Sequence, residues 1–223
     1  MGKGSERRGR SATPIVSSPV SSFRLILASA SPRRAAILSS AGFQFKTISA
    51  AVDETRRRGE SAEVYVRRLA LEKARAVAGR VGRGGAGVRR GYTVVVGADT
   101  AVVVGPMVWG KPESRADARR MLRGLSGRAH QVLTGVALVV LGGGSERVRE
   151  RVFVEKTRVG FVRLSNVEIE EYVRTREPFD KAGAYAIQGL GAKFVRRIEG
   201  CYFNVMGLPL ARVYQELQKH HAR

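Results

Sequence analysis

The alternation of two hydrophobic periods from Phe23 onward is the feature that most constrains the fold of this chain. Short apolar runs and every-second-residue patterns predict β-strands at residues 23–28, 45–49, 92–98, 130–141, 151–164 and 194–198. Apolar residues at helical spacing predict helices at residues 32–41, 61–78, 114–126, 165–174 and 209–219. Residues 101–104 either continue the strand at 92–98 or return from it. Because strands and helices interleave, the sequence indicates an α/β protein, and its long adjacent strands indicate a mixed central sheet flanked by helices.

The composition fits a globular protein and excludes several other classes. The chain has 223 residues, of which 43% are hydrophobic and 26% charged, so a core can form and disorder throughout is excluded. Its longest apolar stretches, residues 93–104 and 132–141, are shorter than the roughly 20 residues of a membrane-spanning helix. The single cysteine excludes an intramolecular disulfide. We therefore expect a soluble protein with no membrane partner, located in a reducing compartment, the cytoplasm.

The charge of the chain is strongly positive. Lys and Arg number 40 against 19 for Asp and Glu, and the net charge of +21 attracts polyanions such as nucleotides, nucleic acids or acidic membrane surfaces. Residues 1–22 are rich in Gly, Ser and Arg, and we expect them to form a disordered basic tail. A transit peptide is the alternative, but no amphipathic helix supports it. Residues 79–91 alternate Gly and Arg and predict a flexible loop within the one remaining domain, residues 23–223.

The first candidate site is the turn between the strand at 23–28 and the helix that follows it. It reads Ser29-Ala30-Ser31-Pro32-Arg33-Arg34. The N-terminus of a helix offers free N–H groups and the positive end of the helix dipole, which together bind phosphate. The two hydroxyls and two guanidiniums of this turn would add charge-assisted hydrogen bonds. The alternative is a serine cap followed by a proline and two solvated arginines.

The second candidate is the pair Asp99 and Thr100, which follows the Val-rich strand at 92–98. A carboxylate at the carboxyl end of an apolar strand lies where α/β sheets place their ligands. Because an unpaired buried carboxylate is costly, Asp99 needs a metal, a cation or a water molecule to activate. The alternative is an Asx-turn that simply ends the strand.

Three further segments contribute charged or polar groups. Lys73 interrupts the apolar stripe of the helix at 61–78, so its amine either reaches the solvent or points at an anion. Asp53 and Glu54 precede an arginine run and form either a Mg²⁺ site or a solvated loop. Lys111 lies in a turn and means little alone. The small-residue segment 180–189 contains Lys181 and, in Gln188, an amide suited to reading the edge of a base. No P-loop or Rossmann glycine motif is present.

The order and spacing of these motifs resemble those of the Maf family. The matching segments extend over about residues 23–218, and they are residues 29–34, 52–54, 97–100, 110–112, 125–130, 177–191 and 207–210. This resemblance implies an elongated sheet with a cleft between two lobes. It also implies a nucleoside triphosphate pyrophosphatase that forms a monophosphate and pyrophosphate with a divalent metal, Mg²⁺ or Mn²⁺. A homodimer is implied by the resemblance as well.

The resemblance also bears on the substrate. Arg33, Thr100 and Gln188 match the branch of the family that acts on dTTP and UTP, whereas the branch acting on 7-methyl-GTP differs at these positions. Modified nucleotides such as pseudo-UTP or 5-methyl-UTP are the alternative substrates. The Gly/Arg loop at 79–91 is longer than usual in the family, and the basic tail is additional to it.

Our hypothesis is that cations from distant parts of the chain hold one triphosphate. The residues expected to bind it are Ser29, Ser31, Arg33, Arg34, Lys73, Lys111 and Lys181. Glu54 and Asp99 are expected to hold the metal or the water that it activates, with Asp99 as the proton acceptor or as a metal ligand only. The rival hypothesis is a basic nucleic-acid-binding protein without hydrolytic activity, motivated by the net charge, with the tail as a contact surface. No pattern of interleaved aromatic residues supports it.

Overall fold

The computed structural model describes residues 23–83, 92–142 and 148–219. Its strands are β1 (Phe23–Ala28), β2 (Phe45–Thr47), β3 (Tyr92–Val104), β4 (Met107–Trp109), β5 (Ala129–Gly142), β6 (Arg149–Phe161) and β7 (Val195–Glu199). Its helices are α1 (Pro32–Ser40), α2 (Ala62–Arg83), α3 (Arg115–Leu125), α4 (Asn166–Arg174), α5 (Tyr202–Met206) and α6 (Leu210–Gln218), with short 3₁₀ turns η1 (Glu177–Asp180), η2 (Ala182–Ala184) and η3 (Leu190–Phe194). Among these helices none is both long and apolar enough to cross a membrane.

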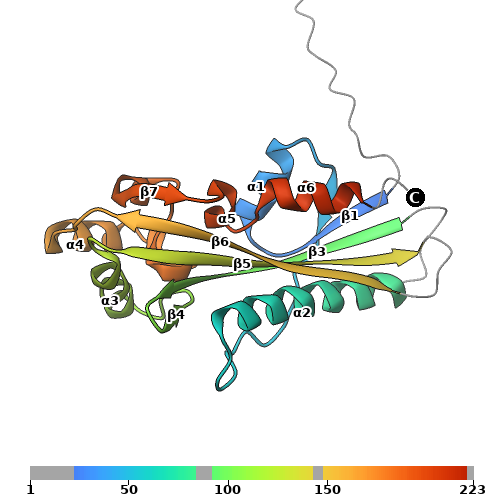
Figure 1. The fold of residues 1–223 in the computed structure, drawn as a ribbon, viewed down its shortest axis with the longest axis horizontal. Coiled ribbons are helices and arrows are strands. Elements are labelled where there is room, and N and C mark those ends of the chain that lie inside the picture. Colours follow the sequence, from blue (N-terminus) through green and yellow to red (C-terminus); the bar gives the residue numbers. More distant parts are fainter. Residues whose placement is uncertain (1–22, 84–91, 143–147, 220–223) are drawn as a thin grey trace, which may run out of the picture.

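The strands form one seven-stranded mixed sheet (Figure 1). Its order is β2-β1-β3-β5-β6-β7, and β4 pairs with β3 beside this path. β1 is parallel to β2 and to β3, whereas the other pairs are antiparallel. The long strands β3, β5 and β6 run along the length of the molecule, which confirms the predicted mixed, elongated sheet flanked by helices.

Helices cover both faces of this sheet at one end of the molecule. α2 lies against one face, and α1, α5 and α6 lie on the other (Figure 1). On one face, the apolar residues of α2 pack against every second residue of β3 and β5. On the other face, the apolar residues of α1 and α6 pack against the remaining residues of the same strands. This alternation follows from the two-residue period of a strand, which sends successive side chains to opposite faces.

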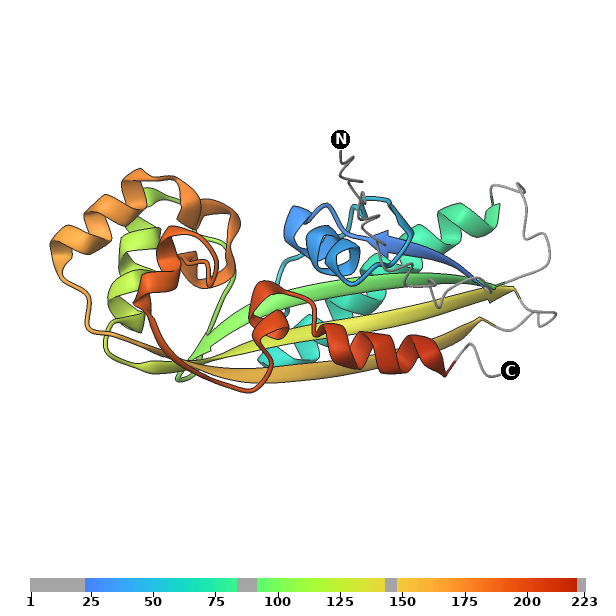
Figure 2. The same ribbon diagram turned by 90° about the horizontal axis from the view of Figure 1, so that it is seen from above.

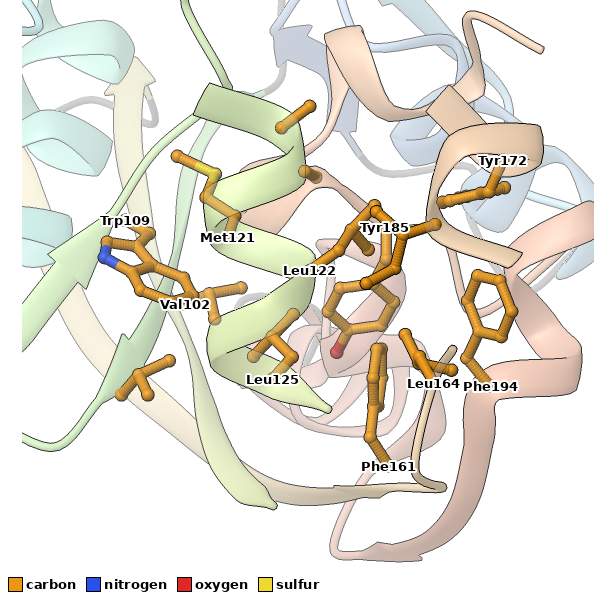
Figure 3. Packing of buried hydrophobic residues seen from close by; sticks show 14 of the residues in the cluster. Val102, Trp109, Met121, Leu122, Leu125, Phe161, Leu164, Tyr172, Tyr185 and Phe194 are labelled. Atoms are coloured by element: carbon orange, nitrogen blue, oxygen red, sulfur yellow. The ribbon is translucent and has the colours of Figure 1, made fainter. Parts of the chain in front are cut away.

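A second group of elements lies at the other end of the long strands, as Figure 2 shows for α3 and α4. Their core is a separate cluster in which Leu122 and Leu125 of α3 meet aromatic residues from β6 and the C-terminal segment (Figure 3). Phe161 and Tyr185 pack edge to face with their ring centroids 4.7 Å apart. This cluster is separate from the two that pack on the faces of the sheet at the other end, in keeping with the two-lobed shape that the family resemblance implies.

Two glycines allow α2 to lie unusually close to the sheet. A Cβ atom added to Gly97 would lie 2.2 Å from the Ala70 carbonyl oxygen, and one added to Gly135 would lie 2.2 Å from the Val66 carbonyl oxygen. Only residues without a side chain therefore fit at these positions. The close approach brings the middle of α2 next to the part of β3 that follows Gly97.

Several sequence-based boundaries were wrong. α2 continues to Arg83, so residues 79–83 of the predicted loop are helical, and residues 84–91 lie outside the described part. β3 is one continuous strand through Val104, which settles whether residues 101–104 continue or return. β4 and α5 were not predicted, since each is too short to produce a periodic pattern. The predicted basic tail, residues 1–22, also lies outside the described residues.

Candidate active site

The candidate site lies where one edge of β3 is open. Along that edge β1 pairs with β3 as far as Gly97, and β4 pairs with it only from Val102 onward. Within the described residues, 98–101 therefore have no neighbouring strand on this side. A cavity of about 380 Å³ opens beside them, bordered by the turn before α1, the segment before α2, α2 itself, the 180–188 segment and α5. It begins at the carboxyl end of β1, the place where parallel strands of α/β sheets present ligand sites.

Lys73 of α2 joins the two acids that the sequence puts forward. Its Nζ atom lies 2.6 Å from Asp99 Oδ1 and 2.6 Å from Glu54 Oε1. Lys73 and Asp99 are buried, whereas the Glu54 side chain is 55% exposed. The lysine therefore points at carboxylates instead of the solvent, which decides between the two alternatives left by the sequence.

The electrostatic surroundings of the two acids differ. Burial raises the pKa of Asp99, although Lys73 and Arg34 oppose this shift. Asp99 is thus a stronger base than an ordinary aspartate. Burial also disfavours the charged form of Glu54, but the hydrogen bond and the charge of Lys73 outweigh it and hold the pKa of Glu54 below its usual value. Glu54 is therefore ionised, whereas burial makes Asp99 readier to take up a proton.

The segment that carries Glu54 is anchored to α2 although it has no regular secondary structure. Tyr65 donates a hydrogen bond from its hydroxyl to the Glu54 carbonyl oxygen at 3.0 Å. Arg68 donates to both carboxylate oxygens of Glu60, at 2.7 and 2.8 Å. The Glu60 side chain is only 4% exposed, so this is a buried ion pair. These contacts fix the position from which Glu54 reaches the cavity.

Arg34 connects three separate parts of the chain. Its Nε donates to the Gly207 carbonyl oxygen at 2.8 Å, its Nη1 to Ser29 Oγ at 3.2 Å and its Nη2 to Thr100 Oγ1 at 3.1 Å. Burial lowers the pKa of Arg34, and the charge of Asp99 opposes that shift. A guanidinium nonetheless stays protonated at neutral pH. Arg34 is therefore a fixed positive charge in the wall of the cavity.

Arg33 crosses the cavity. Its Nη1 donates to Asp180 Oδ2 at 2.7 Å and its Nη2 to the Asp180 carbonyl oxygen at 3.1 Å, over a separation of 147 residues. Lys181 pairs with the same carboxylate and donates to the Glu177 carbonyl oxygen at 2.8 Å. These contacts link α1 to the η1 turn. Arg33, Lys181 and Asp180 therefore lie together in the wall of the cavity beside that turn.

The remaining predicted residues line the same cavity. Ser31 is the cap residue of α1 and Pro32 follows it, as the structural alternative expects, but the two arginines are not solvated, since both form hydrogen bonds across the site. Lys111 and Gln188 are exposed at the rim. All the predicted site residues border one space, and they are Ser29, Ser31, Arg33, Arg34, Glu54, Lys73, Asp99, Thr100, Lys111, Lys181 and Gln188.

Tyr65 and Asp180 also border the cavity, and neither was among the predicted site residues, although Asp180 begins the segment 180–189 that the sequence singled out. Tyr65 precedes Lys73 by eight residues on α2, and this multiple of four places both on one ridge of the helix. That spacing was a usable signal. For Asp180 the local signal was the adjacent Lys181, with which it pairs, but its second partner Arg33 is distant in the sequence and left no signal.

The donor groups fit a divalent metal that binds together with phosphate. In the described part of the chain no cluster of three or more His, Cys, Asp or Glu side chains gathers to hold an ion by itself. Glu54 and Asp99 do converge, since both contact Lys73 Nζ. Mg²⁺ is commonly held by one or two carboxylates with waters and substrate phosphates supplying the other oxygens. Two converging carboxylates in a cationic cavity match that donor set.

The fold and the cavity define an α/β protein with a binding site for a compact polyanion. A model of the Maf family, described as Maf-like protein, matches residues 24–220, and the chain belongs to this family.

Curated relatives match over nearly their whole length. The chain is 50% identical over 194 residues to the dTTP/UTP pyrophosphatase of Symbiobacterium thermophilum, which covers 87% of this chain and 92% of that protein. It is 49% identical to the dTTP/UTP pyrophosphatase of Pseudoalteromonas atlantica, covering 87% of this chain and 96% of that protein. It is 46% identical to the protein of the same name from a Geobacillus species, covering 88% and 97%.

Proposed function

We propose that this protein is a nucleoside triphosphate pyrophosphatase that hydrolyses dTTP and UTP to the monophosphate and pyrophosphate. The observation that carries the proposal is the convergence of four cationic side chains and two carboxylates on one cavity, at Arg33, Arg34, Lys73, Lys111, Glu54 and Asp99. Relatives at 46–50% identity carry the name of this activity. Modified pyrimidine nucleotides such as pseudo-UTP and 5-methyl-UTP are further substrates of the same kind.

In the proposed reaction a water oxygen forms a bond to the α-phosphorus, and the bond from that phosphorus to the bridging oxygen breaks. The electron pair of the broken bond leaves with pyrophosphate, and Asp99 accepts the proton of the attacking water. The pKa of Asp99, raised by burial, suits this role. Arg33, Arg34 and Lys111 stabilise the negative charge that builds on the leaving pyrophosphate.

We further propose that the reaction uses Mg²⁺ or Mn²⁺, which Glu54 and Asp99 would hold. When bound, such an ion neutralises phosphate charge and lowers the pKa of a coordinated water. Lys73 keeps both carboxylates in place before substrate arrives, since it contacts each of them at 2.6 Å. Asp99 then acts as proton acceptor, as metal ligand, or as both.

For base selection we propose Arg33, Thr100 and Gln188, the positions that match the dTTP/UTP branch. Thr100 and Gln188 line the same cavity and offer hydroxyl and amide groups. A site that forms hydrogen bonds with one base rejects others strongly, because its polar groups would otherwise be buried without partners. dTTP and UTP should therefore be cleaved faster than dATP and GTP.

The test incubates the purified protein with each common NTP and dNTP and either Mg²⁺ or Mn²⁺, and separates pyrophosphate from orthophosphate among the products. Asp99→Asn should abolish turnover while nucleotide binding, measured by calorimetry, persists. A matched control is Asp117→Asn, because the Asp117 side chain on α3 accepts from the Glu113 backbone N–H and pairs with Arg120, and it does not line the cavity. Full turnover in Asp99→Asn would refute the assigned role, and equal rates on all nucleotides would refute the base selectivity alone.

A homodimer, contact with nucleic acid through the basic tail and a location in the cytoplasm are further proposals from the sequence. The rival, a nucleic-acid-binding protein without hydrolytic activity, rests on the net charge of +21. It predicts salt-dependent DNA binding that persists after residues 1–22 and 84–91 are deleted and no release of pyrophosphate from any nucleotide. Binding that disappears with the tail would instead show that the tail steers a catalytic domain toward polyanions.

A further inference from the structure

A third acid, Asp180, borders the cavity apart from Glu54 and Asp99. In the described part of the chain no three His, Cys, Asp or Glu side chains gather into a group that could hold a metal, so Asp180 does not complete the pair of carboxylates proposed for that role. A negative charge in a site for polyphosphate also repels the ligand. The role of Asp180 must therefore lie in its contacts with the cations around it.

The Asp180 carboxylate bridges two of the cations expected to bind phosphate. Its Oδ2 accepts a hydrogen bond from Arg33 Nη1 at 2.7 Å, and its Oδ1 accepts one from Lys181 Nζ. Burial disfavours the charged form of Asp180, but the hydrogen bonds from Lys181 and Arg33 outweigh it and hold the pKa of Asp180 below its usual value. The carboxylate is therefore ionised at neutral pH. It presents two oxygen acceptors to two cations, as a phosphate group would.

Each of these cations has a second anchor that does not involve the carboxylate. Arg33 Nη2 donates to the backbone carbonyl oxygen of Asp180 at 3.1 Å, and Lys181 Nζ donates to the Glu177 carbonyl oxygen at 2.8 Å. These bonds to the backbone remain when the Asp180 side chain turns away. The carboxylate is therefore not needed to hold the two cations at the cavity, and a phosphate group can replace it.

The backbone near Asp180 is held in place, whereas the Asp180 side chain is free to turn. The Glu177 carboxylate accepts from the backbone N–H groups of Leu190 and Gly191, both at 3.0 Å. It also accepts from the Tyr172 hydroxyl at 2.8 Å. The Asp180 side chain itself is 60% exposed. Rotation of this side chain into the solvent therefore releases both cations without moving the backbone.

We propose that Asp180 competes with phosphate for Arg33 and Lys181, and that it thereby weakens the binding of pyrophosphate and promotes its release. After cleavage the pyrophosphate still contacts the cavity cations, which would lose a charged partner when it leaves. A carboxylate attached beside them supplies a replacement partner at high effective concentration. This inference rests on the proposed function, because pyrophosphate is the product of that reaction.

The experiment measures the dissociation constant of inorganic pyrophosphate by calorimetry in the presence of Mg²⁺. Asp180→Asn keeps the side-chain shape and removes the charge, so the constant should fall about fivefold, the upper value for an exposed ion pair. The matched control is Glu199→Gln. Glu199 lies between Arg158 and Arg197, at 3.3 and 3.2 Å, and does not border the cavity. This control removes one negative charge from between two cations elsewhere, and it should leave the constant unchanged.

A dissociation constant that stays the same or rises in Asp180→Asn would overturn the proposal, and a rise would show that Asp180 positions its cations for phosphate instead. Equal tightening in Glu199→Gln would also overturn it, because the effect would then come from net charge alone. Damage to the structure does not produce tighter binding, so the expected result is distinct from a structural defect. The wild-type protein tests the function separately. Cleavage of no nucleoside triphosphate would refute the proposed function, whereas normal cleavage with an unchanged constant in Asp180→Asn would refute this inference alone.

Discussion

Replacing Gly97 with alanine tests whether the closeness of α2 to β3 creates the site. The added Cβ would lie 2.2 Å from the Ala70 carbonyl oxygen and 2.7 Å from the Ala74 backbone nitrogen, whereas ordinary contacts span 3.4–4 Å. Backbone atoms cannot rotate away as a side chain can. α2 must therefore move outward by at least about 1.2 Å at this point.

The displacement falls on the residue that holds both acids. Lys73 immediately precedes Ala74, and its 2.6 Å contact with Asp99 would lengthen beyond hydrogen-bonding distance. Overpacking of a core costs about 1–3 kcal/mol of unfolding free energy. Misplacing a catalytic group by about 1 Å costs on the order of 100-fold in rate. We expect Gly97→Ala to lower both the free energy of unfolding and the catalytic rate by about these amounts.

The assay combines urea unfolding with kcat/KM for UTP. Gly82→Ala is the control, since Gly82 lies in the same helix and an added Cβ there has no atom within 4 Å. It should gain about 0.5–1 kcal/mol of stability from the higher helix propensity of alanine and keep its activity. A Gly97→Ala variant with wild-type stability and wild-type kcat/KM would refute the reasoning. A variant with lower stability but unchanged kcat/KM would refute the link from helix position to the site.

Three further predictions concern the surroundings of the site. Replacing Glu60 with glutamine should lower the free energy of unfolding by about 2 kcal/mol in urea titrations at pH 7, because Arg68 would lose its charge-assisted hydrogen bonds to Glu60 and keep those to Glu72 and the Thr55 carbonyl oxygen. The hydrogen bond from Arg68 lowers the pKa of Glu60 to about 2 from its ordinary 4.5. The stability that this pair provides is thus complete above pH 4.5 and is lost as the pH falls toward 2, a dependence that Glu60→Gln should lack. Tyr65→Phe should reduce kcat/KM about tenfold with less than about 1.5 kcal/mol of lost stability, because one hydrogen bond to the Glu54 backbone disappears; unchanged kcat/KM would show that Glu54 needs no such anchor. Removing divalent metal with a chelator should stop hydrolysis without lowering the midpoint of thermal unfolding, because Lys73 already compensates both carboxylates; a fall in that midpoint would indicate a structural metal instead.

Local patterns in the sequence were sufficient for most elements. The bounds of β1 match the prediction, and α4 begins near the predicted start with a capping box of Ser165 and Glu168. Ser114, the first residue of the predicted helix at 114–126, caps α3. Such signals depend on neighbours within a few residues, so they can be recognised before the chain folds. The end of α2 could not be recognised in this way, because its glycines have low helix propensity and the segment has no complete apolar stripe.

The sequence alone also determined which chemical groups are available and roughly where each would stand. Arg33 had to lie in the first turn of a helix, since this is a property of local chain order. The prediction that Asp99 follows a strand end was wrong, because β3 continues through Val104 and Asp99 lies within it. Tertiary structure decided their partners. Lys73 reaches Asp99 because Gly97 admits α2 to the sheet, and Arg33 meets Asp180 across 147 residues. Thr100 meets Thr134 because β5 pairs beside β3. No local pattern encodes such partners, because they lie in segments that are distant in the sequence and meet only when the chain folds.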